Sequence, residues 1–243
     1  NLSTGKHNSL WNLNPGQKHD RGTWRLIEAD VRSVDAEVFK DQVVIHLAAI
    51  ADPQISLNNP DLVTHNCACT AHIVNSKPKH LVFASTAAVY SLNTPYAAAK
   101  LVDDELIQER LESYTIFRFG TIFGPSPGMR FHTAVNKFCW QAFTNQPITV
   151  WEGAMDAIRP YLYIDDVVET IRDYHDKHGI HDVASCHGTV RDIIASLEKH
   201  ATIEVKVVPS PPMNQASYKV DCKLPMAYSL DRGIATTLSS FQS

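Results

Sequence analysis

Three residues near the middle of the chain have the types and the spacing of a proton-transfer site: Thr86, Tyr96 and Lys100. Tyr96 and Lys100 are four residues apart, so on a helix they lie on the same face, one turn apart. An ammonium beside a phenol favours the phenolate and lowers the pKa of the phenol from ~10. The hydroxyl of Thr86 can orient the oxygen that the phenolate deprotonates. Together these groups could remove a proton from an alcohol while a hydride leaves the same carbon.

The Tyr-Lys spacing alone is weak evidence, because a surface tyrosine and lysine would give the same pattern. The surrounding elements strengthen the interpretation. Residues 79–86, KHLVFAST, predict a buried strand that ends in hydroxyl residues. Residues 94–113 predict a helix, with Thr94 as its cap and Pro95 in its first turn. Thr86 would then lie at the carboxyl end of a strand, where ligands bind in open α/β sheets.

Strands and helices alternate through the first half of the chain. The predicted strands are 23–30, 43–49, 79–86 and 114–120, and the helices between them are 35–42, 58–75 and 94–113. The continuous apolar strand 43–49 is expected to be buried on both faces. The second half is mixed, with helical segments 130–146 and 188–201, an extended segment 147–151, and a segment 161–178 that begins as a strand and turns into a helix. This order predicts an α/β fold with a doubly wound parallel sheet and a smaller C-terminal region that covers the substrate.

The composition excludes several classes of protein. The 243 residues are 44% hydrophobic and 20% charged, with a formal net charge of −4, which does not suggest a nucleic-acid or membrane partner. The longest apolar run, 43–51, is shorter than the ~20 residues of a membrane span, and no signal peptide opens the sequence. Five cysteines, an odd number, indicate reduced thiols rather than a disulfide framework. We expect a cytoplasmic protein.

Two groups of residues have spacings that approach those of metal ligands. Cys67 and Cys69 form a Cys-x-Cys pair, but no second pair accompanies them. His175, His178 and His181 are three residues apart, but they fall in a polar stretch at a predicted helix end, with no carboxylate cluster. We therefore expect no metal.

Several motifs in fixed order resemble the extended short-chain dehydrogenases/reductases, specifically the NAD-dependent nucleotide-sugar epimerase/dehydratase family. The catalytic signature is FASTAAVY followed by PYAAAK. The other matching segments are NLSTGKHNSL, EADV, VVIHLAAIAD, FRFGTIFGPS, IRPYLYIDDVV and YKVDCKLPMAYSLDRGIATTL. The resemblance implies a Rossmann-type fold, NAD as cofactor, a nucleotide-sugar substrate and a homodimer. It divides the chain into a NAD-binding domain, 1–120, and a mixed substrate-binding region, 121–243, with some segments returning to the first domain.

The resemblance also implies roles for individual residues. Tyr96 would be the base, Lys100 its partner and a ligand of the nicotinamide ribose, and Thr86 the group that polarises the substrate. The implied cofactor-binding residues are Asn1, Ser3, Thr4, Asp30, Val31, Leu47, Ala48, Ala49, Asn66, Tyr96 and Lys100. The implied substrate-binding residues are Thr86, Thr121, Asn136 and Arg159. Arg159 would meet the diphosphate of the substrate, and the alternative is a salt bridge to Asp165 or Asp166.

Departures from the family pattern reduce the number of reactions that the protein could catalyse. Ala87 and Ala88 stand where dehydratases of the family carry an Asp-Glu pair, and decarboxylases usually keep the Glu, so both reactions are disfavoured. Reversible oxidation at a sugar carbon remains, in either an epimerase or a reductase. The leading interpretation is an epimerase that acts at C4 of a UDP- or dTDP-hexose. The alternatives are an NAD(P)H-dependent keto-sugar reductase and a non-catalytic dinucleotide-binding protein. Thr121 stands where many 4-epimerases carry Asn, which leaves the sugar and the carbon open.

The glycine-rich phosphate-binding turn of the family has no counterpart in the sequence. We expect that turn, its βαβ unit and the residue that discriminates NAD from NADP to precede Asn1. Nine residues separate Thr86 from Tyr96, fewer than is usual in the family, so we also expect omitted loop residues there. The same holds at the join near Lys77, where the helix runs early into the next strand.

Overall fold

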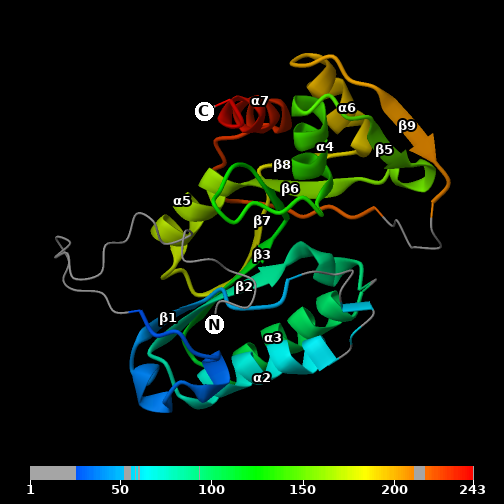
Figure 1. The fold of residues 1–243 in the computed structure, drawn as a ribbon. Helices are drawn as coiled ribbons and strands as arrows, with labels where there is room; N and C mark the ends of the chain where they lie inside the picture. The colour runs from blue at the N-terminus through cyan, green and yellow to red at the C-terminus, as the bar shows by residue number, and fades with distance from the viewer. Residues whose placement is uncertain are drawn as a thin grey trace.

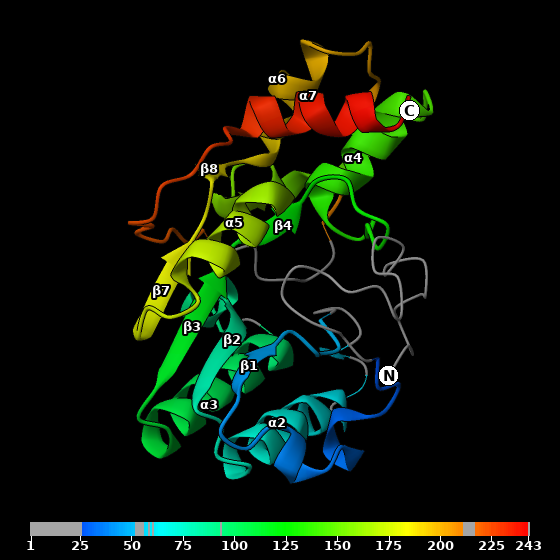
Figure 2. The same cartoon turned by 90° about the vertical axis from the view of Figure 1, so that its left-hand side faces the viewer.

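Four parallel strands form the main sheet. Their order is β1 (Val43–His46), β2 (His80–Thr86), β3 (Tyr114–Phe119) and β7 (Gly179–Val183). The computed structural model describes residues 26–51, 56–57, 59, 61–92, 94–210 and 217–242. Figure 2 shows the four strands side by side in this order. The predicted parallel α/β sheet is confirmed, and one of its strands comes from the second half of the chain.

Helices cover both faces of this sheet. Helices α2 (Asp61–Asn75) and α3 (Pro95–Arg110) lie together on one face, below the sheet in Figure 1. Helix α5 (Ile164–Tyr174) packs on the other face, where Val167 meets Val82 and Phe117. Helices on the two faces of a parallel sheet are the doubly wound arrangement.

The residues of β2 alternate between the two cores. Leu81 and Phe83 pack with Ile107 of α3, whereas Val82 packs on the α5 side. All three β2 side chains are almost completely buried. A strand buried on both faces has a continuous apolar sequence, which is why residues 79–86 were predictable as an inner strand.

The second part of the chain builds a separate core beyond the carboxyl ends of β2 and β3. A three-stranded sheet has the order β4 (Thr121–Phe123), β6 (Arg159–Tyr163) and β8 (Cys186–Gly188), and β5 (Ile148–Trp151) pairs with β9 (Val205–Val208). The helices of this part are α4 (Ala134–Phe143), α6 (Val190–Glu198) and α7 (Leu230–Ser240). They gather at the end of the molecule opposite α2 and α3 (Figure 1). The domain boundary between residues 120 and 121 falls between β3 and β4 and stays a prediction.

The helix that carries the Tyr-Lys pair begins as expected. The hydroxyl of Thr94 accepts a hydrogen bond from the backbone N–H of Ala97, at 3.2 Å, and Pro95 occupies the first turn. Thr94 thus satisfies one of the backbone N–H groups that a helix start leaves unpaired. The register of Tyr96 and Lys100 on α3 follows from this start.

Three expectations for the N-terminal elements are wrong. Residues 26–30, the described part of the predicted strand 23–30, form no strand, and the predicted helix 35–42 is only the 3-10 turn η3 (Ala36–Val38). Strand β1 is not buried on both faces, because Val43 and Ile45 are about half exposed, at 53% and 47%. Within the described residues β1 pairs only with β2 and lies at the sheet edge, beyond the cover of α5.

None of the helices described in the structure combines the length and the apolar character needed to cross a bilayer.

Gly120 joins β3 to β4 at a point without room for a side chain. A Cβ there would lie 2.9 Å from the carbonyl oxygen of Pro160, a backbone atom of β6. We predict that Gly120→Ala lowers the free energy of unfolding by about 1–3 kcal/mol, measured by urea denaturation, because the backbone must shift.

The matched control is Gly153→Ala. A Cβ at Gly153 would meet the hydroxyl of Ser210, the movable end of a side chain. We expect this variant to lose less stability than Gly120→Ala. Equal losses in the two variants would contradict the prediction.

Candidate active site

A cavity of about 600 Å³ lies at the carboxyl ends of β2 and β3. It brings together the three residues of the predicted catalytic set, Thr86, Tyr96 and Lys100. Its other walls come from the loop after β1, from β4 and from the start of α4. A cavity at this edge of a parallel sheet is where open α/β folds bind their ligands.

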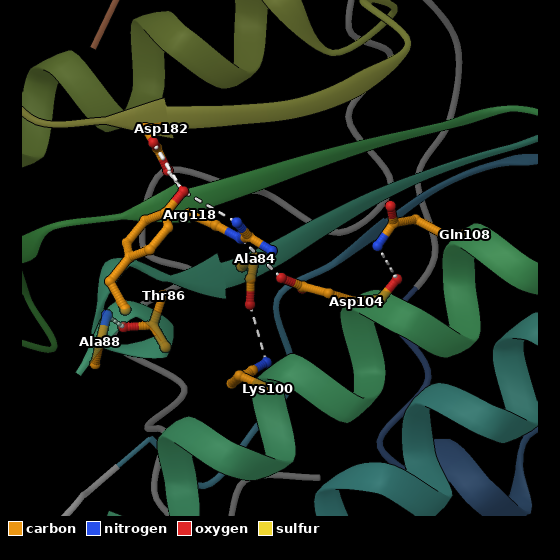
Figure 3. A network of polar contacts seen from close by, with 9 residues as sticks. Ala84, Thr86, Ala88, Lys100, Asp104, Gln108, Arg118 and Asp182 are labelled. Atoms are coloured by element: carbon orange, nitrogen blue, oxygen red, sulfur yellow. Dashed lines mark hydrogen bonds and ion pairs between the residues drawn. The ribbon is translucent and has the colours of Figure 1, made fainter. Parts of the chain in front are cut away.

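The ammonium of Lys100 is held against β2. Its side chain is 4% exposed, and Nζ donates a hydrogen bond to the carbonyl oxygen of Ala84 at 2.9 Å. Nζ also lies 4.2 Å from the ring centroid of Phe83. Figure 3 shows Lys100 reaching from α3 to Ala84 on the strand. A lysine ammonium has three donors, so two remain for a ligand in the cavity.

The electrostatics of Tyr96 differ from the sequence-based expectation. Burial and, to a smaller extent, the charge of Asp103 raise the pKa of Tyr96 to about 12, and only the charge of Arg130 lowers it. The expected lowering of this pKa by Lys100 is therefore wrong, because burial outweighs the nearby cations. Burial also lowers the pKa of Lys100, an effect that the charges of Asp103 and Asp104 oppose.

Thr86 ends β2 and caps the short helix η4 (Ala87–Tyr90). Its hydroxyl oxygen accepts a hydrogen bond from the backbone N–H of Ala88 at 3.2 Å. A threonine hydroxyl carries one donor as well as its acceptor sites. The proton of the Thr86 hydroxyl can therefore be directed at a ligand in the cavity.

A polar cluster holds the turn that carries Thr86. The hydroxyl of Tyr90 donates to the carboxylate of Asp182 at 2.9 Å and accepts from Arg118 at 3.0 Å. Arg118 also donates to Asp104 of α3 at 3.0 Å (Figure 3). These contacts tie η4 to β3, β7 and α3. Sequence reasoning missed them, because their partners are up to 92 residues apart and share no motif.

Apart from Tyr96 and Lys100, the predicted cofactor residues separate into four groups. Leu47 and Ala49 line the cavity, and Ala48 lies between them without lining it. Asn66 lies behind this loop, where its amide accepts from the N–H of Ile50 at 2.9 Å and donates to the C=O of Ile50 at 3.1 Å. Asn1, Ser3 and Thr4 lie outside the described residues. The remaining pair, Asp30 and Val31, does not line this cavity.

Asp30 lies instead in a charged cluster beside α2. Both of its carboxylate oxygens accept hydrogen bonds from Arg32, at 2.9 and 3.1 Å, and this contact lowers the pKa of Asp30. Ligand atoms of Asp30, His65 and Cys69 lie within 4.8 Å of one another, a grouping that no sequence spacing indicated. The guanidinium of Arg32 already compensates the negative charge of the Asp30 carboxylate.

The predicted substrate residues lie around two adjoining cavities. Thr121 lines both the large cavity and a second one of about 310 Å³, and Arg159 lines the second. The guanidinium of Arg159 lies 4.9 Å from the ring centroid of Tyr218. Asn136 is buried and bridges two backbone groups, accepting from Gly124 N–H and donating to the C=O of Arg130, both at 3.0 Å.

The carboxylates weighed as partners of Arg159 bind other groups. Asp166 accepts hydrogen bonds from the hydroxyl of Ser185 and from the N–H of Ala227. Asp165 accepts from the hydroxyl of Tyr228 at 2.9 Å. Sequence reasoning also missed Lys137 and His132, which add basic side chains to the second cavity.

Comparison with known proteins identifies the family. The model of the NAD dependent epimerase/dehydratase family matches residues 7–181. A probable UDP-glucuronate 4-epimerase of Rhizobium meliloti (strain 1021) is 33% identical over 168 residues, which are 56% of this chain and 46% of that protein. The chain thus spans about half the length of this curated relative.

Two solved structures have the same fold. The UDP-N-acetylglucosamine 4-epimerase of Methanobrevibacter ruminantium M1, in complex with UDP-N-acetylmuramic acid, superposes with a TM-score of 0.80 at 22% identity, over 100% of this chain and 88% of that one. The UDP-glucose 4-epimerase of Thermus thermophilus, in complex with NAD, has a TM-score of 0.76 at 21% identity, over 99% and 89%. The Rossmann-type fold expected from the sequence is confirmed. With a family model that matches most of its length, the chain belongs to the NAD-dependent epimerase/dehydratase family.

Proposed function

We propose that the protein is an NAD-dependent epimerase that inverts C4 of a nucleotide-linked hexose or hexuronate. The observation that carries the proposal is the shared cavity of Thr86, Tyr96 and Lys100, which continues through Thr121 into a second, basic cavity. The first cavity has the groups for proton transfer at a sugar carbon, and the second has those for a diphosphate. The relative from Rhizobium meliloti, a probable UDP-glucuronate 4-epimerase, supports C4 and a uridine nucleotide.

The residues of the large cavity suit NAD. Beyond Leu47, the wall after β1 presents only the small side chains of Ala49 and Ala51, so a dinucleotide can pass close to the backbone there. The two unused donors of the Lys100 ammonium suit the hydroxyls of a ribose. The related enzyme of Thermus thermophilus was solved with NAD bound. Leu47, Ala49, Tyr96 and Lys100 would hold the nicotinamide end of the cofactor.

The chain's own groups would then move one proton. Thr86 donates a hydrogen bond to the substrate oxygen and orients it toward Tyr96. The phenolate of Tyr96 takes the hydroxyl proton and later returns it. When bound, NAD would accept the hydride and return it, and its positive nicotinamide would favour the phenolate. Because burial raises the pKa of Tyr96, the positive charge of Arg130 matters for forming that phenolate.

The second cavity is suited to the nucleotide diphosphate. Arg159, Lys137 and His132 supply positive charge or hydrogen-bond donors, and Trp151 supplies an aromatic surface. The planar guanidinium of Arg159 can bind two phosphate oxygens together. Arg130 and His132 also line the large cavity, where an uronate carboxylate would find a cation. We therefore propose UDP-glucuronate and UDP-glucose as the first substrates to test.

We predict that Tyr96→Phe lowers turnover by about 10²–10⁴-fold, because the ring stays in place while the acid-base group is lost. The assay follows the conversion of UDP-glucuronate and UDP-glucose to their C4 epimers by NMR, together with the cofactor that copurifies. Bound NAD should persist in the variant.

The control is Tyr114→Phe at the start of β3, whose hydroxyl removal should leave turnover unchanged. Full turnover in Tyr96→Phe would contradict the role of Tyr96. Net consumption of NADH with a keto-sugar would support the reductase alternative, and cofactor binding without turnover of any sugar would support the non-catalytic one.

Arg159→Gln tests the diphosphate site. Losing a charge-assisted hydrogen bond costs about 1.5–3 kcal/mol, so we predict roughly 10–100-fold weaker binding of UDP, measured by calorimetry. NAD binding should change little. Arg191→Gln is the control, because Arg191 pairs with Asp156 on the surface. Equal UDP affinity in the wild type and in Arg159→Gln would place the diphosphate elsewhere.

We also propose a homodimer in a reducing compartment, the cytoplasm. Helix α3 exposes Val102, which is 54% accessible, among charged residues on its outer face. All five cysteines are free in the structure. Sedimentation velocity should give a species of twice the chain mass that dissociates in Val102→Asp, with Glu105→Gln as the control. A monomer in all three proteins would contradict the dimer.

A further inference from the structure

A third ionisable side chain, Asp103, shares the face of α3 that carries Tyr96 and Lys100. The three occupy positions i, i+4 and i+7, so they stand one above another along the helix. Asp103 is 1% exposed, and Lys100 is 4% exposed. The proton transfer proposed above gives Asp103 no step, so its burial beside the cavity needs another explanation.

The carboxylate of Asp103 has no hydrogen-bond partner among the residues that the structure describes. The nearest donors, on α2, are used elsewhere. The hydroxyl of Thr70 donates to the carbonyl oxygen of Asn66 at 3.3 Å, and the thiol of Cys67 donates to that of Ala99 at 3.8 Å. Both groups lie close enough to lower the pKa of Asp103, but burial outweighs them. A buried carboxylate without donors is strongly unfavourable as an ion unless an opposite charge is close.

Lys100, three residues before Asp103 on the same face of α3, is the cation whose charge lowers the pKa of Asp103. The other ionisable groups around Lys100 and Asp103 are either uncharged or form an ion pair with another residue. Burial raises the pKa of the Cys67 and Cys69 thiols of α2, and burial lowers the pKa of His46 of β1 to about 3. Asp104, the next residue, is bonded to Arg118 of β3. Tyr96 completes the set on α3 itself and is neutral in this structure.

Asp103 is therefore the carboxylate whose charge is compensated by Lys100 and by no other described cation. We propose that Asp103 is a positioning residue that acts through Lys100, holding the buried ammonium charged and in place beside the active-site tyrosine. The inference rests on the proposed function in one respect, that Lys100 serves the reaction. The placement of the two buried charges, three residues apart on α3, does not depend on that function.

The pairing has a consequence for the dependence of stability on pH. Burial raises the pKa of Asp103 from 3.8 to about 6. A group whose pKa is higher in the folded than in the unfolded state stabilises the fold at low pH, and this contribution is lost as pH rises through the folded pKa. The loss from Asp103 should therefore occur between about pH 4 and pH 6.

Asp103→Asn isolates this titration, because the amide keeps the shape and cannot ionise. We predict that the ratio of the unfolding equilibrium constants, wild type over variant, rises on the order of 100-fold between pH 4 and pH 7. The reason is that each unit by which the pKa is raised in the folded state corresponds to a factor of ten. Urea denaturation at half-unit pH steps measures it. Glu105→Gln, the exposed neighbour on α3, is the control and should follow the wild type. Asp103→Ala replaces Asp103→Asn if the amide prevents folding.

Lys100→Met tests whether Asp103 acts through Lys100. In Lys100→Met, the loss of stability that accompanies ionisation of Asp103 should extend to higher pH, because the ammonium no longer favours the carboxylate. The same loss should be absent from the double variant Lys100→Met/Asp103→Asn. In the wild type, the alkaline limb of the kcat profile reports loss of the ammonium proton. Asp103→Asn should shift that limb to lower pH by about one unit, whereas Glu105→Gln should not.

The outcomes separate the two hypotheses. If no nucleotide sugar is turned over but the stability difference appears and depends on Lys100, the proposed function fails and the charge pair stands. If epimerisation occurs while Asp103→Asn changes neither the stability difference nor the alkaline limb, the role of Asp103 is overturned. A stability difference that persists unchanged in Lys100→Met would overturn the action through Lys100.

Discussion

The buried ammonium of Lys100 is the contact on which the candidate site depends. It crosses from α3 to the carbonyl oxygen of Ala84 and so joins the helix to the end of β2. This hydrogen bond also positions the end of the strand, because Thr86, which lines the cavity, lies only two residues after Ala84. A charge can be buried this way only with hydrogen bonding and a compensating charge, and the backbone of β2 and the carboxylates of α3 supply them.

The sheet makes that contact possible. Strand β2 is central and buried on both faces, by α2 and α3 on one side and by α5 on the other. Its carboxyl end therefore has a defined place in a rigid core, and η4 is fixed there by Tyr90, Arg118 and Asp182. Strand β4 of the second sheet starts at Thr121, so Gly120 alone separates the substrate-side residues from the end of β3.

Local sequence signals were enough to predict the inner strands and the helix that carries the Tyr-Lys pair. β2, β3 and α3 were predictable, because continuous apolar runs and a Thr-Pro helix start have few alternative structures. The signals were insufficient for residues 26–30 and for the exposed face of β1. Whether an apolar segment becomes a strand, and how far it is buried, depends on neighbours that lie elsewhere in the chain.

The sequence by itself determined the family, the parallel α/β fold and the register of Tyr96 and Lys100, since these follow from motif order and helical spacing. Only the tertiary structure decided the charges around them. The raised pKa of Tyr96, the unpartnered carboxylate of Asp103 and the basic second cavity all arise from burial and from side chains distant in sequence. The reason is that solvation and Coulomb interactions depend on three-dimensional distances, which residue spacing specifies only within a single helix or strand.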